Sequence, residues 1–309
     1  MPEPIDALLD RIPRFDRPRS VTLLTGGLTN TNYRVDVDGQ VYVVRVSTPD
    51  STLLAIDRDN EDHNARLAAQ SGIAPPVFER LVDPPTLIVG FVPSETLSAH
   101  TVRRGDRLDR IAAALRHLHA SAPFRNRFDM FDIGRRYLAI CDEMGLSLPD
   151  RYVDHHDTVH RIDAALGLHP EVLVPCHNDL LAENLLDDGE RIWIIDFEYS
   201  GNNEPSFELG NLAAESQLDA TQLAELCAHY WGHPSAHRAA RAELWGLVAR
   251  YGWVLWAVIS AEINPLDFDF AAWGMEKYDA FEAAVAAPRF ERLLADAGGA
   301  DSGHADSGR

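Results

Sequence analysis

The sequence predicts an α+β protein with two unequal lobes, a small β-rich lobe at 1–94 and a larger helical lobe at 95–297. Two observations support this prediction. Up to about residue 92, β-branched and aromatic residues gather in short runs separated by turns, whereas further on apolar residues recur at helical spacing. A chain of 309 residues is long enough for two such units.

The first lobe is expected to contain five strands and one helix. The expected strands are 20–24, 33–37, 41–46, 77–81 and 86–92. Asp38-Gly39 is typical of a hairpin turn between the second and third strands. The helix is expected over 57–70, where apolar residues have helical spacing and Gly72 follows as a stop signal.

The second lobe is expected to be mainly helical. Helices are predicted over 107–119, 207–231, 238–263 and 269–295, with short β-like runs at 172–176 and 192–197. The last segment, 298–309, contains mainly Gly, Ser, Asp and Ala, which predicts a disordered tail.

Composition excludes several classes of protein. The 48 acidic and 28 basic residues give a net charge of -20, which predicts no binding to nucleic acid and no attraction to an anionic membrane. The apolar run at 251–261 is too short to span a bilayer, so no membrane insertion is expected. The N-terminus lacks a signal-peptide pattern, which predicts a cytoplasmic protein. The oligomeric state stays open.

A pair of motifs between the two lobes indicates phosphoryl transfer. His177-Asn178-Asp179 is followed by Asn184, and a β-like run ends at Asp196 twelve residues later. Transfer from ATP needs a carboxylate beside the attacking hydroxyl and oxygen ligands for Mg²⁺. Each motif alone is typical of an ordinary turn or buried strand. Together, in this order between a β-rich and a helical lobe, they predict a protein-kinase-like fold in which Asp179 contacts the hydroxyl and Asn184 and Asp196 hold Mg²⁺.

The first lobe supplies a phosphate-binding turn and a cation. A Gly-Gly turn between strands can cover phosphates with backbone amides, although such hairpins are common. The residues expected to contact ATP here are Gly26, Gly27, Asn30 and Asn32. Lys277 is the only lysine of the chain, so Arg45 is expected to be the phosphate-pairing cation, held by Glu61. The alternative is that Arg45 and Glu61 are ordinary surface residues.

Six segments resemble the choline/ethanolamine kinase family, within the wider aminoglycoside-phosphotransferase-like kinases. They are LTGGLTNTNY, YVVRV, DRDNE, CHNDLLAENLL, IIDFEYSGNNEPSFELGN and WVLWAVISAEINPLDFDFAAW, and the similarity runs from about residue 23 to 294. The resemblance implies that Asp179 is the catalytic base and that Asn184 and Asp196 are magnesium ligands. It also implies that Glu198 is an additional metal-site carboxylate.

The resemblance further implies that Arg45 and Glu61 form the phosphate-binding ion pair. Phe91 and Val92 would lie near the interlobe hinge, where adenine is expected. The sequence departs from the family at Glu208, where Asp is usual, and after Glu215, where aromatic residues often follow.

Aromatic residues late in the chain predict a pocket for a cationic acceptor. A trimethylammonium group donates no hydrogen bond, and ring faces hold it at about 0.5–2 kcal/mol per contact. The ring candidates are Tyr199, Trp253, Trp256, Phe268 and Trp273. Glu215 is the preferred carboxylate, ahead of Glu198. The alternative is that tryptophans at helical spacing simply pack the core, which is the expectation for Trp193, Trp231 and Trp245.

The sequence therefore predicts a kinase that uses ATP and Mg²⁺ to phosphorylate the primary hydroxyl of choline or a related amino alcohol. Ethanolamine, thiamine and aminoglycosides are alternative acceptors for the same chemistry. A non-catalytic module that binds a nucleotide or an amine is the alternative from another class. A protein kinase is less consistent with the sequence, because the first lobe lacks lysine.

Overall fold

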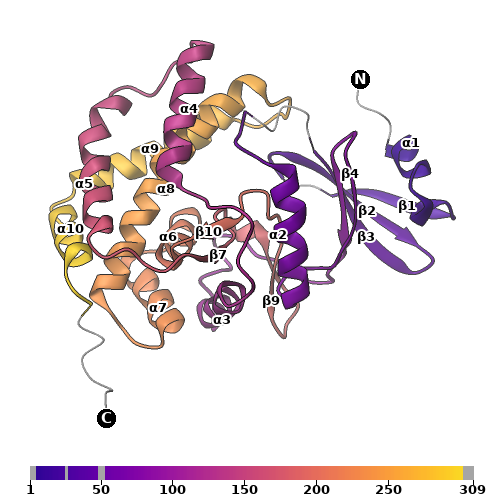
Figure 1. Cartoon of the computed structure of the whole chain (residues 1–309), viewed down its shortest axis with the longest axis horizontal. Coiled ribbons are helices and arrows are strands. Elements are labelled where there is room, and N and C mark those ends of the chain that lie inside the picture. The colour runs from indigo at the N-terminus through magenta and orange to yellow at the C-terminus, as the bar shows by residue number, and fades with distance from the viewer. Residues whose placement is uncertain (1–4, 25–26, 48–52, 302–309) are drawn as a thin grey trace.

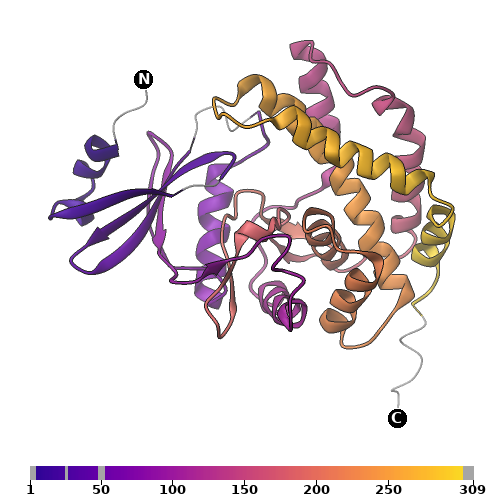
Figure 2. The same ribbon diagram turned by 180° about the vertical axis from the view of Figure 1, so that it is seen from behind.

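The computed structural model describes residues 5–24, 27–47 and 53–301. It confirms the predicted α+β architecture, with an antiparallel sheet in one lobe and a mainly helical second lobe (Figure 1). Helix α2 (Arg58–Ser71) lies between the sheet and the helical lobe in both views (Figure 1, and from behind in Figure 2).

The sheet of the first lobe has five antiparallel strands in the order β1-β2-β3-β5-β4. Their bounds are β1 (Arg19–Leu24), β2 (Asn30–Val37), β3 (Gln40–Ser47), β4 (Val77–Leu81) and β5 (Thr86–Gly90). Helix α1 (Ile5–Asp10), which the sequence did not indicate, brings Leu9 against the buried Val35, Val44 and Ile88. Apolar burial thus attaches the N-terminal helix to the sheet.

Helix α2 begins after a capping aspartate and ends at a glycine. The side chain of Asp57 accepts hydrogen bonds from the backbone N–H groups of Asp59 and Asn60. Gly72 ends the helix in the left-handed region, at φ 87°. The helix therefore carries Arg58 and Glu61 in its first turn, toward the site described below.

Eight α-helices in the described part of the chain follow the sheet. They are α3 (Arg107–His119), α4 (Met130–Met144), α5 (His156–Gly167), α6 (Pro205–Glu215), α7 (Ala220–Trp231), α8 (Ala236–Ile263), α9 (Phe270–Ala286) and α10 (Phe290–Gly298). Two of the predicted helices were wrong as single elements. The segment 207–231 is broken at Gln217, whose φ is 52°, and 269–295 is broken before Phe290, beside Pro288.

Short strands between the helices hold the polar motifs. β7 (Val174–Cys176) pairs with β10 (Gly201–Asn203), and β6 (Glu95–Thr96), β8 (Leu185–Asp187) and β9 (Ile192–Ile194) form a second small sheet. The loop after β7 lies beside the loop after β9, where the Nε2 atom of His177 is 2.8 Å from the carbonyl oxygen of Ile195, so the two predicted motifs meet.

Helix α8 is the centre of the helical lobe. It packs against α6 so closely that a Cβ added at Gly210 would lie 2.0 Å from the carbonyl oxygen of Ala242. By length and composition it contains a window apolar enough to cross a membrane, although its uninterrupted apolar run is the expected 251–261, between Arg250 and Glu262. Because 83% of that window is buried within the protein, its apolar side chains form the core of the lobe.

The chain remains attached beyond the predicted end of the helical lobe. Helix α10 continues to Gly298, and the carboxylate of Asp301 accepts hydrogen bonds from Ser235 and Arg238. Disorder over 298–301 was therefore a wrong prediction, whereas 302–309 lies outside the described residues.

Candidate active site

One buried carboxylate, that of Glu208, fixes the backbone of the loop after β7. Both oxygens of Glu208 in α6 accept backbone hydrogen bonds, from His177 and from Asn178, at 2.8 Å each. Asn178 takes φ 67°, and its side chain donates to three backbone carbonyls of the surrounding strands and turn. Because these bonds fix the loop backbone, Asp179 emerges from a rigid support.

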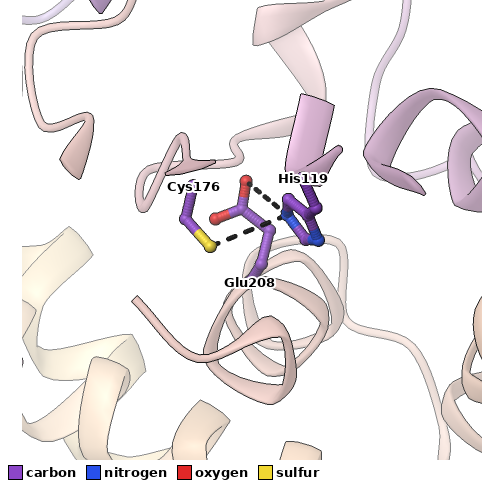
Figure 3. A group of neighbouring side chains, drawn as sticks. All are labelled: His119, Cys176 and Glu208. Carbon is purple, nitrogen blue, oxygen red and sulfur yellow. Dashed lines mark hydrogen bonds and ion pairs between the residues drawn. The ribbon is translucent and has the colours of Figure 1, made fainter. Parts of the chain in front are cut away.

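Glu208 belongs to a buried cluster that joins three elements (Figure 3). The Nε2 atom of His119, at the end of α3, lies 4.0 Å from a Glu208 oxygen and 3.6 Å from the Cys176 sulfur. The other ring nitrogen of His119 is 2.7 Å from the Tyr230 hydroxyl. The cluster therefore supports the loop through Glu208, which stands where the family resemblance led us to expect Asp.

Asp179 lies in a strongly anionic environment. Burial, followed by the nearby carboxylates of Glu215, Glu198 and Asp196, raises its pKa well above the usual value. A half-buried carboxylate with a raised pKa is a stronger base, which suits it to accept a proton from a hydroxyl group in the cavity that it lines.

Asn184 and Asp196 present oxygen atoms beside Asp179. The Asn184 amide donates to the backbone carbonyl of Asp179 at 2.9 Å, so its oxygen is the atom that it can offer to a cation. Asp196 follows β9 with φ 71°. Carboxylate oxygens of Glu61, Asp196 and Glu198 lie within 4.8 Å of one another. This donor set consists of hard oxygen atoms and is chemically suited to Mg²⁺.

Two arginines of the first lobe balance these carboxylates. Arg45 lies 3.2 Å from Glu61, pairs closely with Asp196 and is 3.9 Å from Glu198. Arg58, which sequence reasoning missed, pairs with Glu61 at 2.7 Å and with Glu198 at 3.0 Å. Both guanidinium groups lower the pKa of Glu198 against the effect of burial. Arg45 is therefore buried in an ion network and is not an ordinary surface residue.

Glu198 joins the two lobes through neutral donors as well. Its two oxygens accept hydrogen bonds from the Thr29 hydroxyl at 2.7 Å and from the Asn30 amide at 3.0 Å. Asn30 also contacts Ser47 and Arg58, and it does not contribute to the lining of the interlobe cleft described below. Its direct contact with ATP stays a prediction.

A cleft of about 350 Å³ lies between the lobes. The sequence-predicted residues that line it are Gly27, Asn32, Arg45, Phe91, Val92, Asn184 and Asp196. Gly27 adopts φ 101°, a conformation that favours glycine, whereas Gly26 lies outside the described residues. Glu61 lies behind Arg45 as the predicted ion-pair partner.

A second cavity, of about 340 Å³, lies next to the first. Its lining includes all six predicted acceptor residues, Tyr199, Glu215, Trp253, Trp256, Phe268 and Trp273, together with Asp179. Gly27, Glu183, Asn184 and Asp196 line both cavities. The two cavities therefore meet beside Asp179. Glu183 is the one shared lining residue that was not predicted from the sequence.

Three rings of the second cavity, those of Tyr199, Trp253 and Trp256, have hydrogen-bond partners for their polar atoms within the protein. The indole N–H of Trp256 donates to the Tyr199 hydroxyl at 2.8 Å, and that of Trp253 donates to Asn211 at 3.2 Å. Trp256 and Trp273 meet edge to face, with ring centroids 5.5 Å apart. The cavity can therefore offer ring faces and edges to an acceptor. Trp245, which was expected to be structural, donates its indole N–H to Glu204 inside the core.

Glu215 lines the cavity but already has a cationic partner. The ammonium of Lys277 donates to both of its oxygens, at 2.6 and 2.5 Å. This pair was not expected from the sequence, because Lys277 belongs to α9 and Glu215 to the end of α6.

The fold and the meeting of these two cavities define a kinase-like phosphotransferase. The family model for choline/ethanolamine kinase matches residues 21–228. The crystal structure of a choline/ethanolamine kinase family protein from Mesorhizobium loti has a TM-score of 0.84 and 32% identity, covering 95% of this chain and 98% of that one. The chain belongs to the choline/ethanolamine kinase family, and is a phosphotransferase that acts on an alcohol group.

Two further proteins are similar over most of the chain. Protein LicA from Haemophilus influenzae is 26% identical over 271 residues, which cover 82% of this chain and 77% of that protein. Choline kinase LicA from Streptococcus pneumoniae has a TM-score of 0.77 at 22% identity, with 90% and 99% of the two chains covered, which supports the fold.

Proposed function

We propose that this protein transfers the γ-phosphate of ATP, with Mg²⁺, to the primary hydroxyl of choline or a related amino alcohol. The observation that supports it best is the meeting of the two cavities at Gly27, Glu183, Asn184 and Asp196. One cavity has a cation for phosphates, and the other has the Asp179 carboxylate for the hydroxyl group and ring faces for the ammonium group of a small alcohol. A direct in-line transfer needs this arrangement of nucleotide and acceptor.

Each residue near the junction has a proposed task. Asp179 accepts a hydrogen bond from the acceptor hydroxyl, orients its oxygen toward the nucleotide cleft and takes its proton. Arg45 contacts the phosphates. Asn184 and Asp196 would hold Mg²⁺, which when bound neutralises phosphate charge. Glu198 stands beside them as a further carboxylate, and its hydrogen bonds keep Thr29 and Asn30 over the junction.

The acceptor cavity favours a small alcohol. At about 340 Å³ it suits choline or ethanolamine better than an aminoglycoside, which is a much larger polycation. Ring faces attract a quaternary ammonium without the acceptor atoms that N–H groups require. Ethanolamine is the second candidate, because the family name covers both alcohols.

ADP release from purified protein with Mg-ATP tests the proposal. The acceptors are choline, dimethylethanolamine, ethanolamine, thiamine and kanamycin, with a reaction lacking acceptor as the control. We expect turnover with choline that falls as methyl groups are removed. Turnover only with thiamine or kanamycin would overturn the acceptor assignment. ATP binding without turnover on any of these alcohols would favour a non-catalytic module.

A further inference from the structure

The chain's only lysine is buried beside the acceptor cavity. Lys277 lies in α9, one helical turn after Trp273, and its ammonium is 3.9 Å from the centre of that indole ring. The same ammonium donates to both Glu215 oxygens. Trp273 and Glu215 line the cavity, so an internal cation stands behind two groups of its wall.

The carboxylate of Glu215 is consequently neutralised before any acceptor enters. Both of its oxygens are used by Lys277, and the two side chains are almost entirely buried. Arg250 of α8 is a second cation near Glu215. Its guanidinium donates to the carbonyl of the neighbouring Ala214 at 3.2 Å. The wall therefore offers an acceptor cation no free carboxylate at Glu215.

We propose that Lys277 determines acceptor specificity, because it occupies Glu215 and leaves the aromatic rings to recognise a fully N-methylated ammonium in preference to a primary one. This inference rests on the proposed function. A primary ammonium has three N–H donors, each of which needs an acceptor when it leaves water. A trimethylammonium has none, and its methyl groups pack on ring faces such as those of Trp256 and Trp273.

The test compares choline with ethanolamine in Lys277→Met and in the double variant Glu215→Gln/Lys277→Met. Methionine preserves much of the side-chain length against Trp273 but frees the carboxylate. The choline-to-ethanolamine ratio of kcat/KM is expected to fall at least about tenfold in Lys277→Met, or about 1.4 kcal/mol. The double variant has neither charge and should retain the wild-type ratio. An unchanged ratio in folded Lys277→Met would overturn the proposal.

A second arm covers the case in which Lys277→Met does not fold. Glu215→Gln leaves the lysine ammonium unpaired at the cavity wall, so the KM for choline should rise about tenfold or more through repulsion. Adding Lys277→Met should restore it. A double variant that stays as impaired as Glu215→Gln would mean that Glu215 contacts the acceptor directly, which contradicts the proposal.

Binding of unreactive probes separates this inference from the proposed function. Wild-type protein should bind tetramethylammonium more tightly than methylammonium in calorimetric titrations, and Lys277→Met should narrow the difference. Probe preference without turnover of either alcohol would mean that the proposed reaction fails while the role of Lys277 stands. If choline is turned over but wild-type protein and Lys277→Met bind each probe equally tightly, the role of Lys277 is contradicted while the proposed function stands.

Discussion

Asp179 is half-buried and lines the acceptor cavity directly. Replacing it with Asn preserves the shape but removes the group that we propose as the proton acceptor. We expect Asp179→Asn to lower turnover about 10²–10⁴-fold while ATP binding changes little. ADP release and nucleotide titration measure the two effects. Asp142→Asn, on the exposed surface of α4, is the matched control, and equal turnover of the two variants would contradict the assignment.

At the same scale, replacing Glu208 is predicted to lower the stability of the fold. Its carboxylate is fully buried and accepts the N–H groups of His177 and Asn178. In Glu208→Gln one of these amides loses its acceptor, so we expect a loss of about 1–3 kcal/mol in the free energy of unfolding. Urea denaturation measures it. Glu143→Gln, on an exposed position of α4, should leave the unfolding midpoint unchanged.

Sequence reasoning recognised those residues whose partners lie in one short motif. Asp179, Asn184 and Asp196 are close in sequence, and their order and spacing between a β-rich and a helical lobe predicted that they would converge. Lys277 was missed, because its partner Glu215 lies 62 positions away. Arg58 was missed as the partner of Glu198, 140 positions away, although its other partner Glu61 lies only three positions along the same helix. A basic residue carries no local sign of such distant pairing, which only the packing of the lobes creates.

At the scale of elements, α8 connects the core of the helical lobe to the acceptor cavity. Trp256→Ala removes a ring from the cavity and should raise the KM for the acceptor far more than the KM for ATP. Trp256→Phe retains a ring and should preserve most of the acceptor affinity, although it loses the bond to Tyr199. Steady-state kinetics with each substrate varied in turn measures this. Equal effects on both KM values would argue against a role in acceptor binding.

Helices and strands were predictable where the pattern and its end signals agree. The predicted bounds of α3 and β4 match the structure, because their apolar spacing and flanking turns coincide. The break between α6 and α7 was missed, since 216–219 contains neither Gly nor Pro. There the chain turns through Gln217 in a left-handed conformation, and Asp219 caps α7.

At the scale of the whole molecule, Arg58 ties the lobes together by pairing with Glu198 across the junction. Arg58→Gln leaves two buried carboxylates with less compensation, and we expect it to lower the free energy of unfolding by about 3 kcal/mol. Chemical denaturation with and without nucleotide measures the change. Arg66→Gln breaks a more exposed pair with Asp62 on the same helix and should cost less than about 1 kcal/mol. Equal losses would contradict the interlobe role.

The end-to-end meeting of two cavities has a consequence for inhibitor chemistry. A single elongated molecule with adenosine at one end and a quaternary ammonium at the other could occupy both spaces at once, passing Gly27 and Asp196. Linking the two halves makes the second contact intramolecular, so its affinity could exceed that of either half by about 10²–10⁴-fold. The length of the most potent linker would then measure the distance between the two bound ends, across which the proposed phosphate transfer takes place.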